Sequence, residues 1–149
     1  MKVAVLMGSA NDRPKMAPAV EMLASFGVEA TEHVLSAHRT PAAVTALASG
    51  ARDAGYAAMI CGAGMAAHLA GVVAAHTTLP VIGVPLSGGA LNGVDALYAT
   101  VQMPRGVPVA TVAVDGSANA AILAVQILAV TDAGLARRLE EFRAQWSAP

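Results

Sequence analysis

The sequence is poor in cysteine, in charge and in long apolar runs. Cys61 is the only cysteine among 149 residues, so no disulfide can form within the chain, and a reducing compartment is favoured. Nine Lys and Arg stand against ten Asp and Glu, and the basic residues are scattered apart from Arg137 and Arg138. This pattern lacks the basic stripe that a phosphate backbone requires, so nucleic acid is not an expected partner.

Membrane segments and metal centres are not predicted either. The longest apolar stretch, at 120–130, is interrupted by Gln126 and falls short of the roughly 20 residues that cross a bilayer. The opening MKVAVLM breaks at Gly8, too early for a secretory signal, and no metal-type spacing links the histidines to Cys61. We expect a soluble, cytoplasmic protein without a metal.

The scarcity of charge has a second consequence. Hydrophobic residues make up 56% of the chain and charged residues only 13%, which leaves little polar material to coat a small domain. Alanines are tolerated on exposed helices, but we expect the chain to bury apolar surface in a homo-oligomer. The length suits a single domain over residues 1–149.

Apolar, β-branched runs alternate with alanine-rich stretches along the chain. The runs lie at 3–7, 28–35, 57–61, 81–84 and 108–114, and helices are expected at 13–26, 41–54, 66–77, 92–102, 118–130 and 132–146. Such alternation is typical of βαβ units. It predicts an α/β fold: a three-layer α/β/α sandwich around a flavodoxin-like, doubly wound parallel sheet of about five strands.

Polar or glycine-rich segments follow the first four predicted strands. They read GSANDRP, SAHRTP, GAGMAAHLAG and PLSGGALNGVD. Because ligands of such folds bind outside the carboxyl ends of the strands, we expect all four segments to meet at one edge of the sheet.

The second segment carries the most specific chemistry. Thr40 is a predicted N-cap and Pro41 suits the first helical position, which places His38 and Arg39 in a loop. A histidine exchanges protons near neutral pH, and an arginine can bind a phosphate at two points. The alternative is a solvated histidine beside a surface charge.

The first segment offers an anion site at a predicted helix start. Asp12 is the expected cap of a helix entered through Pro14, and Ser9 could add a hydroxyl donor to the free N–H groups there. Plain turn chemistry is the alternative interpretation.

The third segment, GAGMAA at 62–67, fits the loose dinucleotide pattern but follows the wrong strand and lacks a suitably spaced acidic residue. We expect it to approach a small, flat ligand. His68, in the first turn of the next helix, contacts that ligand or donates to a backbone carbonyl. We expect His33 and His76 to be structural and Cys61 to be a buried hydrophobe.

The segments MGSAND, SAHRTP, GAGMAAHLAG and LNGVDALYATVQMPRGVPVAT, in this order, resemble the phosphoribosylaminoimidazole carboxylase catalytic-subunit family, and within it the bacterial N5-carboxyaminoimidazole ribonucleotide mutases. The resemblance runs from about Val3 to Leu128. It implies conversion of N5-carboxyaminoimidazole ribonucleotide to 4-carboxy-5-aminoimidazole ribonucleotide in purine biosynthesis, with CO2 as a trapped intermediate. It further implies no cofactor, a homo-octamer, and a partner synthase that supplies the carbamate.

The resemblance also implies roles for individual residues. His38 would be the general acid and base. The 5′-phosphate would contact Ser9, Ser36 and Arg39, and the ribose would contact Asp12. The full substrate-binding set it implies is Gly8, Ser9, Asp12, Ser36, Ala37, Arg39, Gly62, Ala63, Gly64, Met65, Ala66, His68 and Leu69.

The chain departs from the family pattern at a few positions. Met65 stands where glycine is common and Ala70 where proline is common, and the stretch 113–120 is shorter than the usual version, which has a lysine. One rival function is direct carboxylation of aminoimidazole ribonucleotide, whose loop usually begins SAHK. Another is a non-catalytic nucleotide-binding module, in which His38→Asn would leave ligand affinity nearly unchanged.

Overall fold

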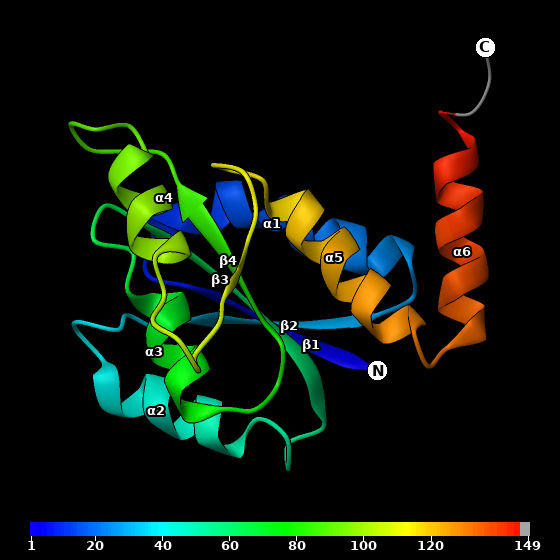
Figure 1. Ribbon diagram of the computed structural model, residues 1–149, viewed down its shortest axis with the longest axis horizontal. Helices are drawn as coiled ribbons and strands as arrows, with labels where there is room; N and C mark the ends of the chain where they lie inside the picture. The colour runs from blue at the N-terminus through cyan, green and yellow to red at the C-terminus, as the bar shows by residue number, and fades with distance from the viewer. Residues whose placement is uncertain (147–149) are drawn as a thin grey trace.

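The computed structural model describes residues 1–146, which form a parallel sheet between two layers of helices (Figure 1). The sheet order is β2-β1-β3-β4-β5. The strands are β1 (Lys2–Met7), β2 (Glu29–Val34), β3 (Tyr56–Gly64), β4 (Val81–Leu86) and β5 (Ala110–Thr111). This is the flavodoxin-like order, and it confirms the predicted α/β/α fold.

Alternate residues of each central strand face opposite layers. Val3, Val5 and Met7 of β1 pack with helices α1 (Arg13–Ser25), α5 (Ser117–Ala129) and α6 (Ala133–Ala144). Ala4 and Leu6 face α2 (Pro41–Gly50) and α3 (Leu69–His76). The five side chains from Val3 to Met7 are fully buried, which explains why β1 is apolar after Lys2.

Two strands differ from the predicted length by more than two residues. The fifth, expected over 108–114, forms regular pairing only at Ala110 and Thr111, although Val112 N and Asp115 N still donate to carbonyls of the β4 strand at 3.2 and 2.9 Å. Pro108 has no N–H to contribute, so regular pairing cannot begin there. The third strand is longer than predicted and runs to Gly64, so the first glycines of the third segment belong to the sheet.

The last predicted helix is present as α6. Its N-cap is Asp132, whose carboxylate accepts a hydrogen bond from Leu135 N at 2.9 Å. Leu135 is its one buried residue, and Phe142 stacks edge-to-face on Phe26 with ring centroids 5.3 Å apart. Across residues 1–146, no helix combines the length and apolar character needed to cross a membrane.

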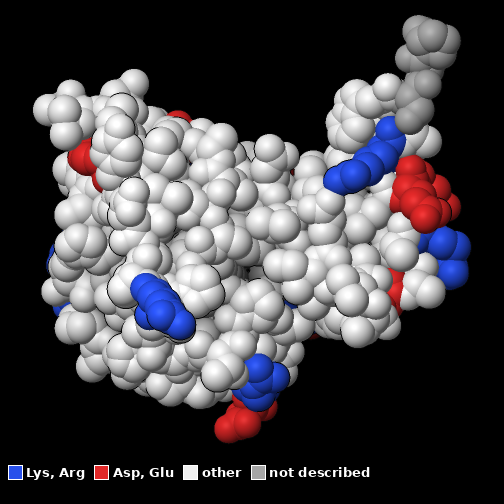
Figure 2. Space-filling view, in the orientation of Figure 1, with Lys and Arg blue, Asp and Glu red and all other residues white. Residues whose placement is uncertain are grey.

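Helix α4 (Val94–Val101) leaves an apolar stripe exposed. Val94, Tyr98 and Val101 recur at spacings of four and three along the helix, and Leu91 lies in the turn before it; each exposes about half of its surface or more. Figure 2 shows few charged side chains over this part of the molecule, whereas charges gather on α6. Four of the exposed large hydrophobic side chains therefore lie together at α4.

Candidate active site

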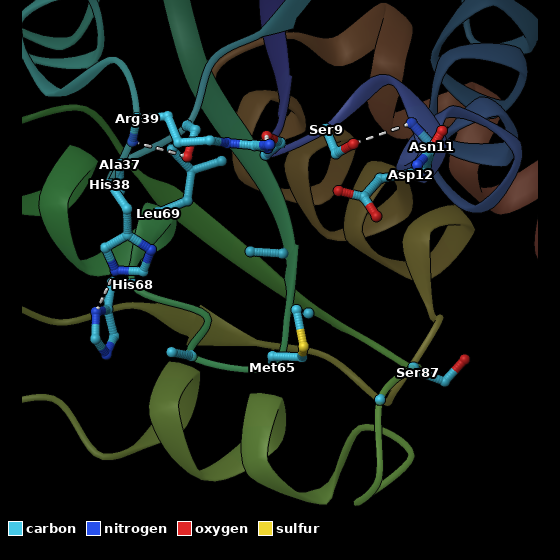
Figure 3. Close-up of a pocket in the computed structure, with 17 residues that line it drawn as sticks. Ser9, Asn11, Asp12, Ala37, His38, Arg39, Met65, His68, Leu69 and Ser87 are labelled. Atoms are coloured by element: carbon cyan, nitrogen blue, oxygen red, sulfur yellow. Dashed lines mark hydrogen bonds between the residues drawn. The ribbon is translucent and has the colours of Figure 1, made fainter.

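The four polar segments meet at the carboxyl edge of the sheet, as predicted, and enclose a cavity of about 550 Å³ (Figure 3). The cavity is lined by Gly8, Ser9, Asn11, Asp12, Ser36, Ala37, His38, Arg39, Ala63, Gly64, Met65, Ala66, His68, Leu69, Ser87, Gly88 and Gly89. The size is that of an ordinary small-molecule site.

One predicted substrate-binding residue does not line this cavity. Gly62 is buried within β3, and a Cβ added to it would lie 2.3 Å from Met16 Sδ. Its lack of a side chain therefore serves packing against α1. Conversely, Asn11, Ser87, Gly88 and Gly89 line the cavity but were not assigned from sequence; the fourth segment was recognised, without a role for any of its residues.

His38 and His68 form a hydrogen-bonded pair. His38 Nε2 lies 2.7 Å from His68 Nδ1, and the two rings meet nearly at right angles with centroids 4.8 Å apart. One of the facing nitrogens must donate and the other accept, so the tautomers of the two rings are coupled. The other ring nitrogen of His38, Nδ1, contacts no partner among residues 1–146 and is available to a ligand.

His68 differs from the prediction in its place at the helix start and in the partner of its ring; since it lines the cavity, its predicted contact with a ligand stays a prediction. It precedes α3 as its N-cap residue rather than lying in the first turn, and its ring contacts another histidine rather than a backbone carbonyl. The two histidines are 30 residues apart, and only the parallel pairing of the strands before them brings them together.

Arg39 is held by the loop that carries it. Its Nη2 donates to Gly8 O at 2.9 Å, and its backbone N donates to Ser36 Oγ at 3.2 Å. Thr40 occupies the N-cap position of α2, but its Oγ1 makes no capping bond; it accepts from Ser36 N and donates to Ser36 O. The threonine therefore closes the 36–40 turn, and the remaining guanidinium N–H groups can bind an anion.

The first segment winds into a short 3-10 helix, Ala10–Asp12, capped by Ser9 Oγ, which accepts from Asn11 N at 3.2 Å. Asp12 precedes α1 but does not cap it, contrary to the prediction, because this short helix runs directly into α1. Partial burial raises the pKa of Asp12 above its ordinary value, and the Ser9 backbone and the charges of Lys15 and Arg39 offset only part of this effect. Its carboxylate remains available to ligand hydroxyls.

Met65 has a left-handed backbone, with φ of +51°. This conformation suits glycine and is strained for most other residues. The side chain is 60% exposed and extends toward Gly89, where an added Cβ would lie 3.2 Å from Met65 Cγ. Figure 3 shows it between the histidine pair and the side of the cavity formed by Ser9 and Asp12.

His33, His76 and Cys61 have contacts within the fold, as expected of structural residues. His33 Nε2 lies 3.0 Å from the Tyr56 hydroxyl, and His76 Nδ1 lies 2.8 Å from Val72 O within its own helix. Cys61 is buried, and this burial raises the pKa of its thiol far above the usual range, so it is not a nucleophile. Within 1–146, no three His, Cys, Asp or Glu residues gather in a metal-binding group.

The fold and site together define a class of protein. It is a doubly wound α/β protein whose ligand cavity, at the carboxyl edge of the sheet, combines an acid–base group with donors for an anion. Hydroxyls, a guanidinium and a carboxylate lie on one side, and the histidine pair lies on the other (Figure 3). Such a cavity suits a small phosphorylated molecule.

Comparison with known proteins gives the family: the chain belongs to the AIR carboxylase family, whose model matches residues 2–148. It is 50% identical over 147 residues to an N5-carboxyaminoimidazole ribonucleotide mutase of Vibrio vulnificus, covering 97% of this chain and 91% of that protein. It is 51% identical over 140 residues to a phosphoribosylaminoimidazole carboxylase of Saccharomyces cerevisiae, covering 94% of this chain. The chain spans about a quarter of the yeast protein's length, since the match covers 24% of it.

The structure is similar to that of PurE from Treponema denticola. The TM-score is 0.89 at 26% identity, and the match covers 98% of this chain and 91% of that one. The family resemblance and the fold expected from sequence are both confirmed.

Proposed function

We propose that this protein is an N5-carboxyaminoimidazole ribonucleotide mutase of purine biosynthesis. The observation that carries the proposal is the placement of His38, held by His68, in one cavity with Arg39 and the hydroxyls of the neighbouring loops. The 50% sequence identity to a mutase, over nearly the whole of both chains, supports the same reaction.

The nucleotide would lie across the cavity with its phosphate toward the first two segments. Arg39 supplies free guanidinium N–H groups, and Ser9 and Ser36 have hydroxyls that can donate to phosphate oxygens. The Asp12 carboxylate accepts from ribose hydroxyls. The aminoimidazole then extends toward the end of β3, next to Met65 and the histidine pair.

His38 would transfer the proton twice. As the carbamate C–N bond breaks, the imidazolium donates a proton to the departing exocyclic nitrogen, and CO2 is released. Carbon C4 then attacks CO2, and the neutral imidazole removes the C4 proton, which returns His38 to its starting state. The hydrogen bond to His68 fixes the ring plane through both steps.

Retention of CO2 depends on the walls of the cavity. CO2 carries no charge to hold it, so it must be confined by close-packed small groups. Ala63 and Gly64 at the end of β3 and Ala66 beyond it supply such a wall, and Leu69 adds an apolar side chain.

The test is an ultraviolet assay that follows formation of the 4-carboxy product from two substrates. Conversion of N5-carboxyaminoimidazole ribonucleotide without added bicarbonate would establish the mutase. Conversion of aminoimidazole ribonucleotide only at high bicarbonate would identify a direct carboxylase instead. No turnover with either substrate, together with tight nucleotide binding, would indicate a binding module.

His38→Asn tests the role of the histidine. We expect turnover to be abolished while nucleotide affinity, measured by calorimetry, stays nearly unchanged. His76→Asn is the matched control, since His76 bonds only to its own helix, and it should retain full activity. Full activity of the His38 variant would refute the assignment.

Assembly and cellular context follow from the same proposal. A homo-octamer, built partly through the apolar stripe of α4, would cover Leu91, Val94, Tyr98 and Val101. Light scattering of the purified protein tests it, and a monomer would contradict it. The carbamate substrate would come from a partner synthase in the cytoplasm, and residues 1–149 would act as one domain.

A further inference from the structure

The fourth wall of the cavity is the loop 87–89, whose glycines leave its backbone flexible unless other residues fix it. Ser87, Gly88 and Gly89 follow β4, and both glycines have positive φ, +146° and +64°. Two adjacent glycines leave the backbone many alternative conformations, so a fixed wall requires anchors outside the loop.

Ser87 is anchored from two distant parts of the chain. Lys15 Nζ, on the first turn of α1, donates to Ser87 O and to Ser87 Oγ, the latter at 2.6 Å. Asp115 accepts from Ser87 N at 2.9 Å and also from the Ser87 hydroxyl. The hydroxyl therefore accepts from the lysine and donates to the aspartate, and all polar groups of Ser87 are used.

The two anchors are themselves fixed and of opposite charge. Lys15 Nζ lies 3.6 Å from Asp115 Oδ1, and Lys15 O accepts from the buried Ser117 hydroxyl at 2.6 Å. Partial burial acts to raise the pKa of Asp115, but the hydrogen bonds from Ser87 and the charge of Lys15 outweigh it and hold that pKa below the ordinary value. The Asp115 carboxylate is therefore ionised at neutral pH and forms an ion pair with Lys15.

Neither Lys15 nor Asp115 lines the cavity, whereas the 87–89 loop that they hold does. We propose that Lys15 and Asp115 are positioning residues: they lock the 87–89 loop through Ser87 and so set how tightly the nucleotide is bound, without touching it. The effect on nucleotide binding rests on the proposed function, whereas the effect on the conformation of the 87–89 loop does not.

Three variants and a control test the inference. Lys15→Met keeps the length of the side chain and removes its charge, Asp115→Asn keeps its shape, and the double variant combines them. Arg13→Met is the matched control, because Arg13 lies on the same turn of α1 but pairs with Glu32, at 3.2 Å, away from the loop.

Two measurements are made on each variant. Hydrogen exchange over 86–93 should accelerate in both single variants, because Lys15→Met removes the donor to Ser87 O and Oγ, and Asp115→Asn removes the charge of the group that accepts from the Ser87 amide and hydroxyl. It should be unchanged in Arg13→Met. We expect KM for the nucleotide to rise about tenfold, the effect of one charge-assisted hydrogen bond, with kcat within about twofold of wild type. The double variant should be no worse than Asp115→Asn alone, because the two residues act as a unit.

Other outcomes would distinguish failure of the positioning role from failure of the proposed function. Exchange and KM that match Arg13→Met in both single variants would overturn the positioning role. A changed KM with unchanged exchange would also overturn it, because the lysine would then act on the ligand itself. Faster exchange in a chain whose wild type lacks mutase activity would leave the positioning role intact and reject the proposed function. If Lys15→Met does not fold, Asp115→Asn alone decides between these results.

Discussion

Replacement of Met65 tests whether its strained backbone and its side chain have separable effects. Its φ of +51° is a conformation that glycine adopts without strain, and its side chain is 60% exposed. Met65→Gly removes both the strain and the side chain. Met65→Ala removes only the side chain, and Met65→Val adds a β-branched group to the same backbone.

The expected magnitudes follow from three contributions. A non-glycine residue in this region costs about 1–2 kcal/mol, which Met65→Gly recovers. The glycine loses about 0.4–1 kcal/mol through the greater freedom of the unfolded chain. Loss of a side chain that is 60% exposed costs about 1 kcal/mol, since full burial of methionine is worth about 1.5–3 kcal/mol. The net change for Met65→Gly is therefore about zero, and for Met65→Ala about 1 kcal/mol of destabilisation.

Urea unfolding at neutral pH measures these differences. We expect Met65→Gly to match wild type within about 1 kcal/mol and Met65→Val to be the least stable of the three, because β-branched residues tolerate positive φ worst. KM of Met65→Gly should still rise about fivefold, from the loss of roughly 1 kcal/mol of apolar contact with the ligand. A Met65→Gly variant destabilised by about 3 kcal/mol, or a Met65→Val variant as stable as wild type, would refute the reasoning.

Two further predictions concern packing and pH. Gly62→Ala should destabilise the protein by about 1–3 kcal/mol in urea unfolding, because its Cβ would lie 2.3 Å from Met16 Sδ. Gly50→Ala, with no atom within 4 Å of the added Cβ, should instead stabilise α2 by about 0.5–1 kcal/mol, and equal effects at both positions would contradict the packing argument. Since the pKa of Asp115 is lowered in the fold, its contribution is complete above the ordinary value of about 3.9 and is lost as the pH falls below it. The stability gap between wild type and Asp115→Asn should therefore narrow between pH 7 and pH 3, and a gap that widens on acidification would show that the sign is wrong.

The sequence was sufficient to predict the layers of the fold and the edge of the sheet that carries the cavity. The strands β1, β3 and β4 can be recognised from their continuous apolar residues, because these strands are buried on both faces. In a parallel sheet, the segments that follow such neighbouring strands must lie at the same edge. The short β5 was predicted too long because an apolar run at a sheet edge need not pair along its length.

The contacts inside the site depend on pairings that local patterns do not encode. His38 and His68 are 30 residues apart, and Lys15 and Ser87 are 72 apart, so each contact exists only after the strands have paired in register. Asp12 has the residue type of a cap, but the preceding 3-10 helix removes the geometry for it. The positive φ of Met65 had one sequence signal, the glycine common at that position in the family.

The order of the site along the chain affects its completion during synthesis. Every residue that lines the cavity lies between Gly8 and Gly89, yet the loop at its fourth wall is anchored by Asp115, and α5, which begins at Ser117, covers the α1 face of the sheet. A nascent chain that has emerged only to residue 100 therefore carries all the cavity residues without the carboxylate that holds Ser87. Asp115 and the start of α5 must therefore emerge before the loop at the fourth wall is anchored, after all the residues that line the cavity have been made.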